Sequence, residues 1–110
     1  MPSLRENSSV VMLRAEDVFD ESTTEPHEVG WALEALVFVR KIEGGGDVKF
    51  SIQISADGMH WLDEGTRLDL PVGTKENFVK LTQFGNWIRL HAHRVENIPL
   101  RVTATLHLKG

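Results

Sequence analysis

The sequence predicts an all-β chain that folds as a single antiparallel β-sandwich of the jelly-roll or immunoglobulin-like type. Short segments alternate apolar and polar residues with the period of two that a half-buried strand requires. This alternation is clearest at 48–55, 87–93 and 100–108. Turn formers such as Asp57-Gly58 separate the segments at short intervals, and no stretch has a convincing helical period. Seven or eight short strands with regular turns are typical of a sandwich.

Length and composition limit the classes of protein to which the chain can belong. At 110 residues it has room for one core but not for two, so we expect a single domain over 1–110. Apolar residues make up 41% and charged residues 25%, which is enough for a packed core. The formal net charge of −4 argues against nucleic-acid binding through a broad basic surface. Cysteine is absent, which excludes disulfides and thiolate metal ligands.

The sequence has no segment of the kind that directs export or membrane insertion. Residues 1–7 lack the apolar centre of a signal peptide. The longest apolar run, 35–39, is far too short to cross a bilayer. We therefore expect a cytoplasmic or particle-associated protein with no signal peptide and no membrane partner.

The first quarter of the chain contains one short apolar run between two irregular segments. Residues 1–8 are polar and are predicted to be a flexible tail. The run at 10–13 is predicted to be a first strand or a segment that docks on a partner. Residues 16–28 carry six carboxylates with no Lys or Arg among them, and Pro26 blocks regular structure, so we predict a long acidic loop.

Residues 31–42 are the most apolar stretch and are predicted to form a strand. Both alternating faces carry apolar groups, and Leu36, Phe38 and Ile42 occupy one of them. Two apolar faces are typical of a central strand that is covered on both sides. We expect a loop, a terminus or another subunit to cover the second face. The residues predicted to form an interface are Trp31, Leu33, Val37 and Val39, together with Val10 and Val11.

The last third of the chain gives the most specific prediction of strand pairing. Residues 87–93 and 100–108 are predicted to form a hairpin through the connection at 94–99. If their inward faces match, Ile88 lies opposite Leu106.

The middle of the chain predicts further short strands. A turn at 56–58 follows the strand at 48–55, and Trp61 and Leu62 are predicted to fold back onto the core directly after it. Two more short strands are predicted at 66–70 and 77–82.

Two histidines form a possible metal-binding pattern. His91 and His93 are two residues apart on a predicted strand, so both imidazoles project from one face. His107 is expected nearby on the paired strand, but the spacing fixes no third ligand. We favour an exposed polar face over a metal site, so no metal and no cofactor are predicted, and His91 and His93 are the candidates if a metal binds.

Two of the three tryptophans are candidates for ligand binding. Trp61 and Trp87 could stack on sugar rings, but the chain has no tyrosine, which sugar-binding faces often use beside tryptophan. We favour the interpretation that the tryptophans anchor the core or its edge, since they bury large areas.

No set of residues predicts catalysis, and we do not expect an enzyme. Asp63 and Glu64 are adjacent, so in a strand their carboxylates point to opposite faces. The glycines at 44–46 lead into a predicted strand, and so lack the helix N-terminus that would hold a phosphate.

Two short motifs resemble a pattern of small β-sandwich proteins. An S-x-D-G-x-x-W turn spans 55–61, and a G-x-W-I-R strand begins at Gly85. Together, over about residues 48–108, they resemble structural proteins of phages and phage-like bacterial assemblies. The resemblance implies a sandwich fold and a structural or adhesive role, with Trp61 plugging the core, and it implies no enzymatic activity.

These observations leave three functions in order of preference. The first is a non-enzymatic structural or assembly module that forms a homo-oligomer, with a trimer possible, or that decorates a larger particle. The second is a module that binds carbohydrate or another ligand. The third is a small metal-dependent enzyme of the cupin type that uses His91 and His93, although the expected cupin signature is absent.

Overall fold

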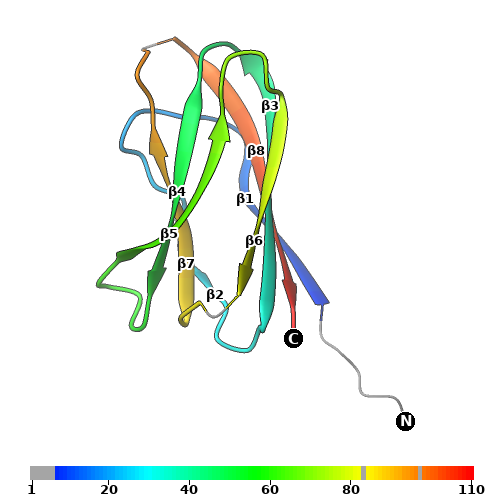
Figure 1. The fold of residues 1–110 in the computed structure, drawn as a ribbon, viewed down its shortest axis with the longest axis vertical. Coiled ribbons are helices and arrows are strands. Elements are labelled where there is room, and N and C mark those ends of the chain that lie inside the picture. The colour runs from blue at the N-terminus through cyan, green and yellow to red at the C-terminus, as the bar shows by residue number, and fades with distance from the viewer. Residues whose placement is uncertain (1–6, 83, 97) are drawn as a thin grey trace.

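The described part of the chain is a sandwich of two antiparallel sheets. The structure, a computed structural model, describes residues 7–82, 84–96 and 98–110. Its strands lie in two layers, as Figure 1 shows, and none of the described residues is helical. The described residues accordingly include no helix with the length and apolarity needed to cross a membrane. The prediction of an all-β sandwich is confirmed.

Within the described residues, each sheet contains four strands. In chain order the strands are β1 (Asn7–Asp17), β2 (His27–Glu28), β3 (Glu34–Gly44), β4 (Val48–Ser55), β5 (Leu62–Leu70), β6 (Glu76–Thr82), β7 (Trp87–His93) and β8 (Leu100–Lys109). We call the sheet with the order β1-β8-β3-β6 sheet A, and the sheet with the order β2-β7-β4-β5 sheet B.

The pairing of the strands is nested. β4 pairs with β5, and outward along the chain β3 pairs with β6, β2 with β7 and β1 with β8, always antiparallel. Two further ladders join β3 to β8 and β4 to β7. The chain therefore resembles one long hairpin that is folded across itself to give two layers.

The predicted hairpin between the last two strands is wrong, although both strands exist with the predicted inward faces. β7 belongs to sheet B and β8 to sheet A. Ile88 consequently lies opposite Ile54, and Leu106 lies opposite Val37. Ile88 and Leu106 are both fully buried, and they enter the core from opposite layers.

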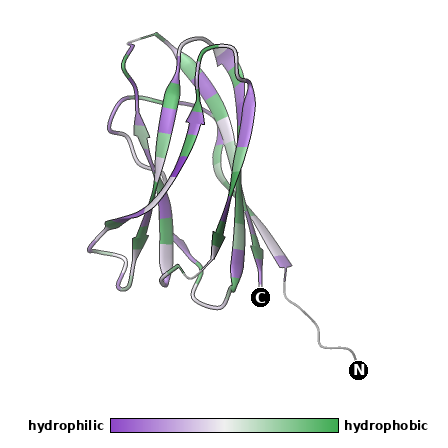
Figure 2. Cartoon of the chain, in the orientation of Figure 1, coloured by the Kyte–Doolittle hydropathy of each residue, from purple (hydrophilic) through white to green (hydrophobic). Residues whose placement is uncertain are grey.

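One hydrophobic core lies between the two sheets. Burial alternates along β7 and β8 as predicted, and Figure 2 shows hydrophobic and hydrophilic residues alternating along the strands. The largest fully buried side chains are those of Phe50, Ile52, Leu68, Leu70, Leu81, Ile88, Leu90, Leu100, Leu106, Val29, Val37 and Val39. Burying a side chain of this size contributes about 1.5–3 kcal/mol, so the core supplies most of the driving force for folding.

The irregular segments near the N-terminus are shorter than predicted. β1 continues to Asp17 and β2 begins at His27, which reduces the acidic loop from 16–28 to 18–26. Of the predicted tail at 1–8, residues 1–6 lie outside the described residues, whereas Asn7 and Ser8 belong to β1. The sequence signal failed here because polar residues on an exposed edge strand look like a loop.

Candidate interaction surfaces

The outer face of sheet A carries a row of exposed apolar side chains. The ladder registers align one residue from each strand across the whole sheet. This apolar row consists of Val11 on β1, Phe38 on β3 and Phe78 on β6, with the half-buried Thr105 of β8 between Val11 and Phe38. Val11, Phe38 and Phe78 are 37%, 41% and 49% exposed. The two phenylalanine rings stack with their centroids 5.6 Å apart.

Charged side chains flank the apolar row along β6, which is an edge strand of sheet A. Glu76 and Lys80 lie two residues before and two residues after Phe78, so all three side chains leave the same face of the strand. Glu76 also lies 3.7 Å from the guanidinium of Arg40 on the neighbouring β3. Exposed apolar groups with a polar rim of this kind are typical of an interaction surface.

Two of the predicted interface residues are in the core. Val37 and Val39 are buried between the sheets, so the prediction that they contact a partner is wrong. The sandwich turns this valine face of β3 toward sheet B and leaves the opposite face, with Phe38 and Ile42, at the surface. The two faces of the strand were correctly separated in the sequence, but the wrong one was assigned to a partner.

The other predicted interface residues lie near the surface. Val11 belongs to the apolar row, whereas Val10 is partly buried against the core. Trp31 and Leu33 precede β3 in its connection from β2, and both are exposed. Their position at the end of the sandwich separates them from the apolar row.

The outer face of sheet B brings together two histidines and a glutamate. His91 Nε2 lies 3.0 Å from Glu21 Oε2, and His93 Nδ1 lies 3.4 Å from Glu21 Oε1. The two imidazole rings are neighbours on β7, with their centroids 4.5 Å apart. Among the described residues, one ligand atom from each of the three side chains lies within 4.8 Å of the other two, as binding of a metal ion requires.

The neighbouring strand β4 contacts the remaining nitrogen of each imidazole. Ser51 Oγ lies 2.9 Å from His93 Nε2, and Gln53 Nε2 lies 3.5 Å from His91 Nδ1. Both contacts run diagonally across the ladder, because the direct cross-strand partner of Ser51 is His91 and that of Gln53 is Arg89. The histidine pair is therefore held from β4 as well as from the loop that carries Glu21.

Glu21 comes from the shortened acidic loop, which runs along the outer edge of β7. The Glu21 N–H donates to the carbonyl of Ala92 over 2.8 Å, and the Ala92 N–H donates to the carbonyl of Ser22 over 2.8 Å. Glu21 adopts a φ of 64°, a left-handed conformation that is rare for residues other than glycine. No sequence pattern indicated this third group, because 70 residues separate Glu21 from His91.

His107 does not join this cluster, which corrects the expectation that it would lie beside the other two histidines. It lies on β8 in sheet A, because β7 and β8 belong to different layers. Its Nδ1 is 2.9 Å from Ser9 Oγ, and its ring meets the ring of Phe38 edge-on at a centroid distance of 5.2 Å.

Both candidate ligand-binding tryptophans lie outside the core. The guanidinium of Arg89 covers the Trp61 ring at 4.3 Å from the ring centroid. Trp87 is packed against the Asp-Gly turn, where a Cβ atom on Gly58 would lie 3.2 Å from its ring. Trp61 therefore does not plug the core as the resemblance implied, and Leu62, at 73% exposure, does not fold back onto it either.

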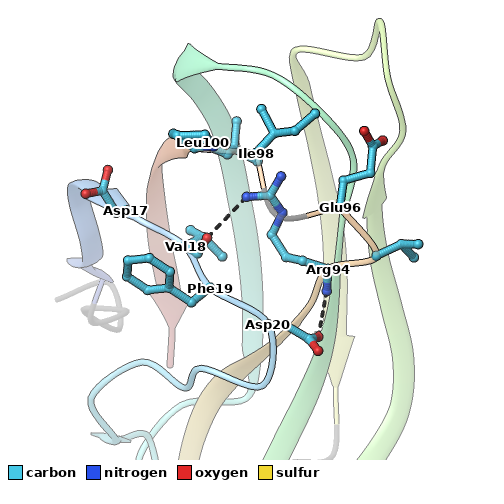
Figure 3. Close-up of a pocket in the computed structure, with 10 residues that line it drawn as sticks. Asp17, Val18, Phe19, Asp20, Arg94, Glu96, Ile98 and Leu100 are labelled. Carbon is cyan, nitrogen blue, oxygen red and sulfur yellow. Dashed lines mark hydrogen bonds between the residues drawn. The ribbon is translucent and has the colours of Figure 1, made fainter.

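A hollow of about 430 Å³ lies where the chain passes from β7 to β8 (Figure 3). Its lining includes the buried Arg94, whose guanidinium donates to the carbonyls of Val18, Gly45 and Asp47 at 3.2, 3.2 and 3.0 Å. The backbone N–H of Arg94 donates to the Asp20 carboxylate at 2.8 Å. Because the guanidinium is engaged with backbone carbonyls, Arg94 joins three segments of chain and is not offered to a ligand. No pattern of residues predicted this role.

Comparison with known proteins places the chain in the class of β-sandwich proteins by its fold. No protein-family model matches the sequence, and no curated protein matches it. Among solved structures, the chain is similar to the SPBc2 prophage-derived protein YomS, with a TM-score of 0.73 and 12% sequence identity. The similarity covers 100% of this chain and 98% of YomS, and at this identity it concerns the fold alone.

A second solved structure has a weaker likeness. It is a family two carbohydrate esterase from Cellvibrio japonicus, with a TM-score of 0.44 and 10% identity. The match covers 97% of this chain but 34% of the esterase, so the chain spans about a third of that protein's length.

Proposed function

We propose that the chain is a non-enzymatic structural module of a phage-type assembly, with a jelly-roll fold, which self-associates through the apolar row of sheet A. The observation that carries the proposal is the exposure of Phe38 and Phe78 in a row that crosses all four strands. Nested strand pairing in two four-stranded sheets supports the jelly-roll assignment, a fold used by viral capsid proteins among others.

A second copy of the chain is the partner that the charges around the row favour. A two-fold axis that brings Phe78 onto its symmetry mate, with the two β6 strands antiparallel, sets Glu76 of each copy against Lys80 of the other. This follows from the equal spacing of both charges from Phe78. The arrangement gives an apolar centre with two opposite-charge contacts at its rim.

The similarity to YomS supports the biological setting of the proposal. YomS is described as a prophage-derived protein, and its fold matches this chain over nearly the whole length of both. The motif resemblance noted in the sequence points to the same class of assembly.

Binding of carbohydrate through the tryptophans has less support. Arg89 occupies one face of the Trp61 ring, and Trp87 is packed against Gly58. A sugar-binding surface needs flat ring faces that are open to solvent, and these contacts cover part of the ring faces of both tryptophans.

The mass of the untagged protein in solution tests the proposal. We expect a dimer at micromolar concentration by light scattering after size exclusion and by sedimentation equilibrium. Phe38→Glu and Phe78→Glu should each weaken the dimer about 30-fold or more, because a central aromatic contact is lost and a charge is buried. Leu62→Glu is the matched control, since Leu62 is exposed on sheet B, and it should leave the dimer unchanged.

Charge exchange at the rim tests the two-fold arrangement separately. Glu76→Lys and Lys80→Glu should each weaken self-association, because each variant then sets like charges against each other. An equimolar mixture of the two variants should form heterodimers, since one partner is positive at both positions and the other negative. A monomeric wild-type protein would overturn the proposal, and a trimer would overturn the two-fold arrangement.

A further inference from the structure

We propose that Glu21, His91 and His93 on the outer face of sheet B bind a divalent transition metal ion, for which Zn²⁺ is the best match. Two imidazole nitrogens and a carboxylate oxygen are a donor set that suits this ion, and three protein ligands leave a fourth position open. The proposal is independent of self-association, because the cluster lies on the sheet opposite the apolar row.

The distances within the cluster are close to those between neighbouring ligands of a tetrahedral ion. Ligand bonds of about 2.0–2.1 Å at tetrahedral angles separate neighbouring ligand atoms by about 3.3 Å. Glu21 Oε2 lies 3.0 Å from His91 Nε2, and Glu21 Oε1 lies 3.4 Å from His93 Nδ1. Because the two contacts use different oxygens, Glu21 would rotate to bring one oxygen onto an ion, and one ligand atom from each of the three residues already lies within 4.8 Å of the other two.

Hydrogen bonding from β4 suits ligation by His93. With Nδ1 on the ion, the proton of the His93 ring lies on Nε2, and it can be donated to Ser51 Oγ at 2.9 Å. A hydrogen bond from the second nitrogen is a regular feature of metal-bound histidine, because it fixes the orientation and tautomer of the ring.

The same support is weaker at His91. With Nε2 on the ion, its proton lies on Nδ1, which faces the Gln53 amide nitrogen at 3.5 Å. The Gln53 amide is already oriented by Arg89, which donates to its oxygen at 2.8 Å, and by Asp63, which accepts from its nitrogen at 3.1 Å. A carboxylate at position 53 would accept the His91 proton, which gives a variant expected to bind the metal more tightly.

The backbone of Glu21 is a second observation that points to this cluster. A left-handed φ of 64° costs a non-glycine residue about 1–3 kcal/mol. The hydrogen bonds with Ala92 hold the loop in this conformation and set the Glu21 carboxylate against both imidazoles. The side chain of Glu21 is 65% exposed, so an ion can enter from solvent and keep a water molecule as its fourth ligand.

Calorimetric titration of Zn²⁺ into metal-free, untagged protein tests the proposal, with the visible spectrum of bound Co²⁺ as a second readout. We expect one site per chain and a raised melting temperature in the presence of Zn²⁺. His91→Gln, His93→Gln and Glu21→Gln should each weaken binding at least 10-fold. Circular dichroism and the melting temperature in EDTA verify that each variant is folded.

Two further sets of variants make the result specific. His60→Gln and His107→Gln are the matched controls, because His60 also meets a carboxylate, that of Asp57 at 2.7 Å, without belonging to the three-ligand cluster. Both should bind Zn²⁺ like the wild type. Gln53→Glu should tighten binding about 10-fold. Absence of a stoichiometric site in the wild type, or equal loss in the control variants, would overturn the proposal.

Discussion

The guanidinium carbon of Arg89 lies 4.3 Å from the centroid of the Trp61 ring, and the Nε of Arg89 donates to Gln53 Oε1 at 2.8 Å. Desolvation by burial lowers the pKa of the Arg89 guanidinium from its ordinary value. The contact ties the segment after the Asp-Gly turn to the outer face of β7, at a place where the sequence predicted that Trp61 would enter the core.

The Arg89–Trp61 contact should be measurable as a coupling energy. A double-mutant cycle with Trp61→Leu and Arg89→Gln is expected to give a coupling of about 0.5–1 kcal/mol in the free energy of unfolding. Urea denaturation followed by circular dichroism measures all four proteins in the cycle. Strictly additive effects of the two substitutions would mean that the cation lies over the ring without stabilising it.

Arg94 should be far more important for stability than an exposed arginine. Arg94→Met removes hydrogen bonds from a buried cation to three carbonyls and is expected to cost at least about 3 kcal/mol in the free energy of unfolding. The control is Arg101→Met, because Arg101 is exposed and pairs with Asp17 and Glu43 at 3.4 and 3.7 Å. We expect less than about 1 kcal/mol there. Similar losses in chemical denaturation of the two variants would contradict the role assigned to Arg94.

Gly58 should be intolerant of a side chain. It has a φ of 81°, and a Cβ atom there would lie 3.2 Å from the Trp87 ring. Gly58→Ala is therefore expected to cost about 1–3 kcal/mol. Gly45→Ala is the control, because nothing lies within 4 Å of a Cβ atom at Gly45. Thermal unfolding of both variants measures the difference, and a Gly58→Ala protein as stable as the control would show that the turn relaxes.

Mild acid should destabilise the fold through His27. Burial lowers the pKa of His27, an effect that the nearby Glu25 carboxylate partly opposes. Its Nε2 is buried without a hydrogen-bond partner among the described residues. Because the folded-state pKa lies below the unfolded value of about 6.5, the unfolded chain binds more protons as the pH falls through that value, and stability is lost.

The variant His27→Gln isolates this effect. The melting temperature of the wild type should fall more between pH 7.5 and pH 5.5 than that of the variant, since the other titratable groups are common to both proteins. An equal fall in the two proteins would assign the acid sensitivity to those other groups.

The alternating pattern of the sequence predicted individual strands well and their partners poorly. β7 and β8 have the predicted inward faces because a period of two reports which side of a strand is apolar. It does not report which sheet the strand joins. A short connection can close a hairpin or cross between layers, and in both cases Ile88 and Leu106 reach the core.

The candidate surfaces depend on contacts between distant parts of the chain. For this reason the sequence pattern predicted only part of each surface. The two histidines on β7 were found because both lie on one strand, whereas Glu21 reaches them through a loop with a left-handed residue. The face of Phe38 became an exposed surface only when the sandwich buried the valine face of β3. Neither arrangement can be predicted from the spacing of residues along the chain.

Nested pairing also has a mechanical consequence. Asn7 and Lys109 are cross-strand partners at one end of the ladder between β1 and β8, and Figure 1 shows that β1 begins close to where β8 ends. A pulling force applied between these residues would break the hydrogen bonds of that ladder one after another rather than all at once. Tethers attached at these two positions would therefore separate β1 from β8 first. The sandwich would come apart at low force, starting from this outermost pair of the nested ladders.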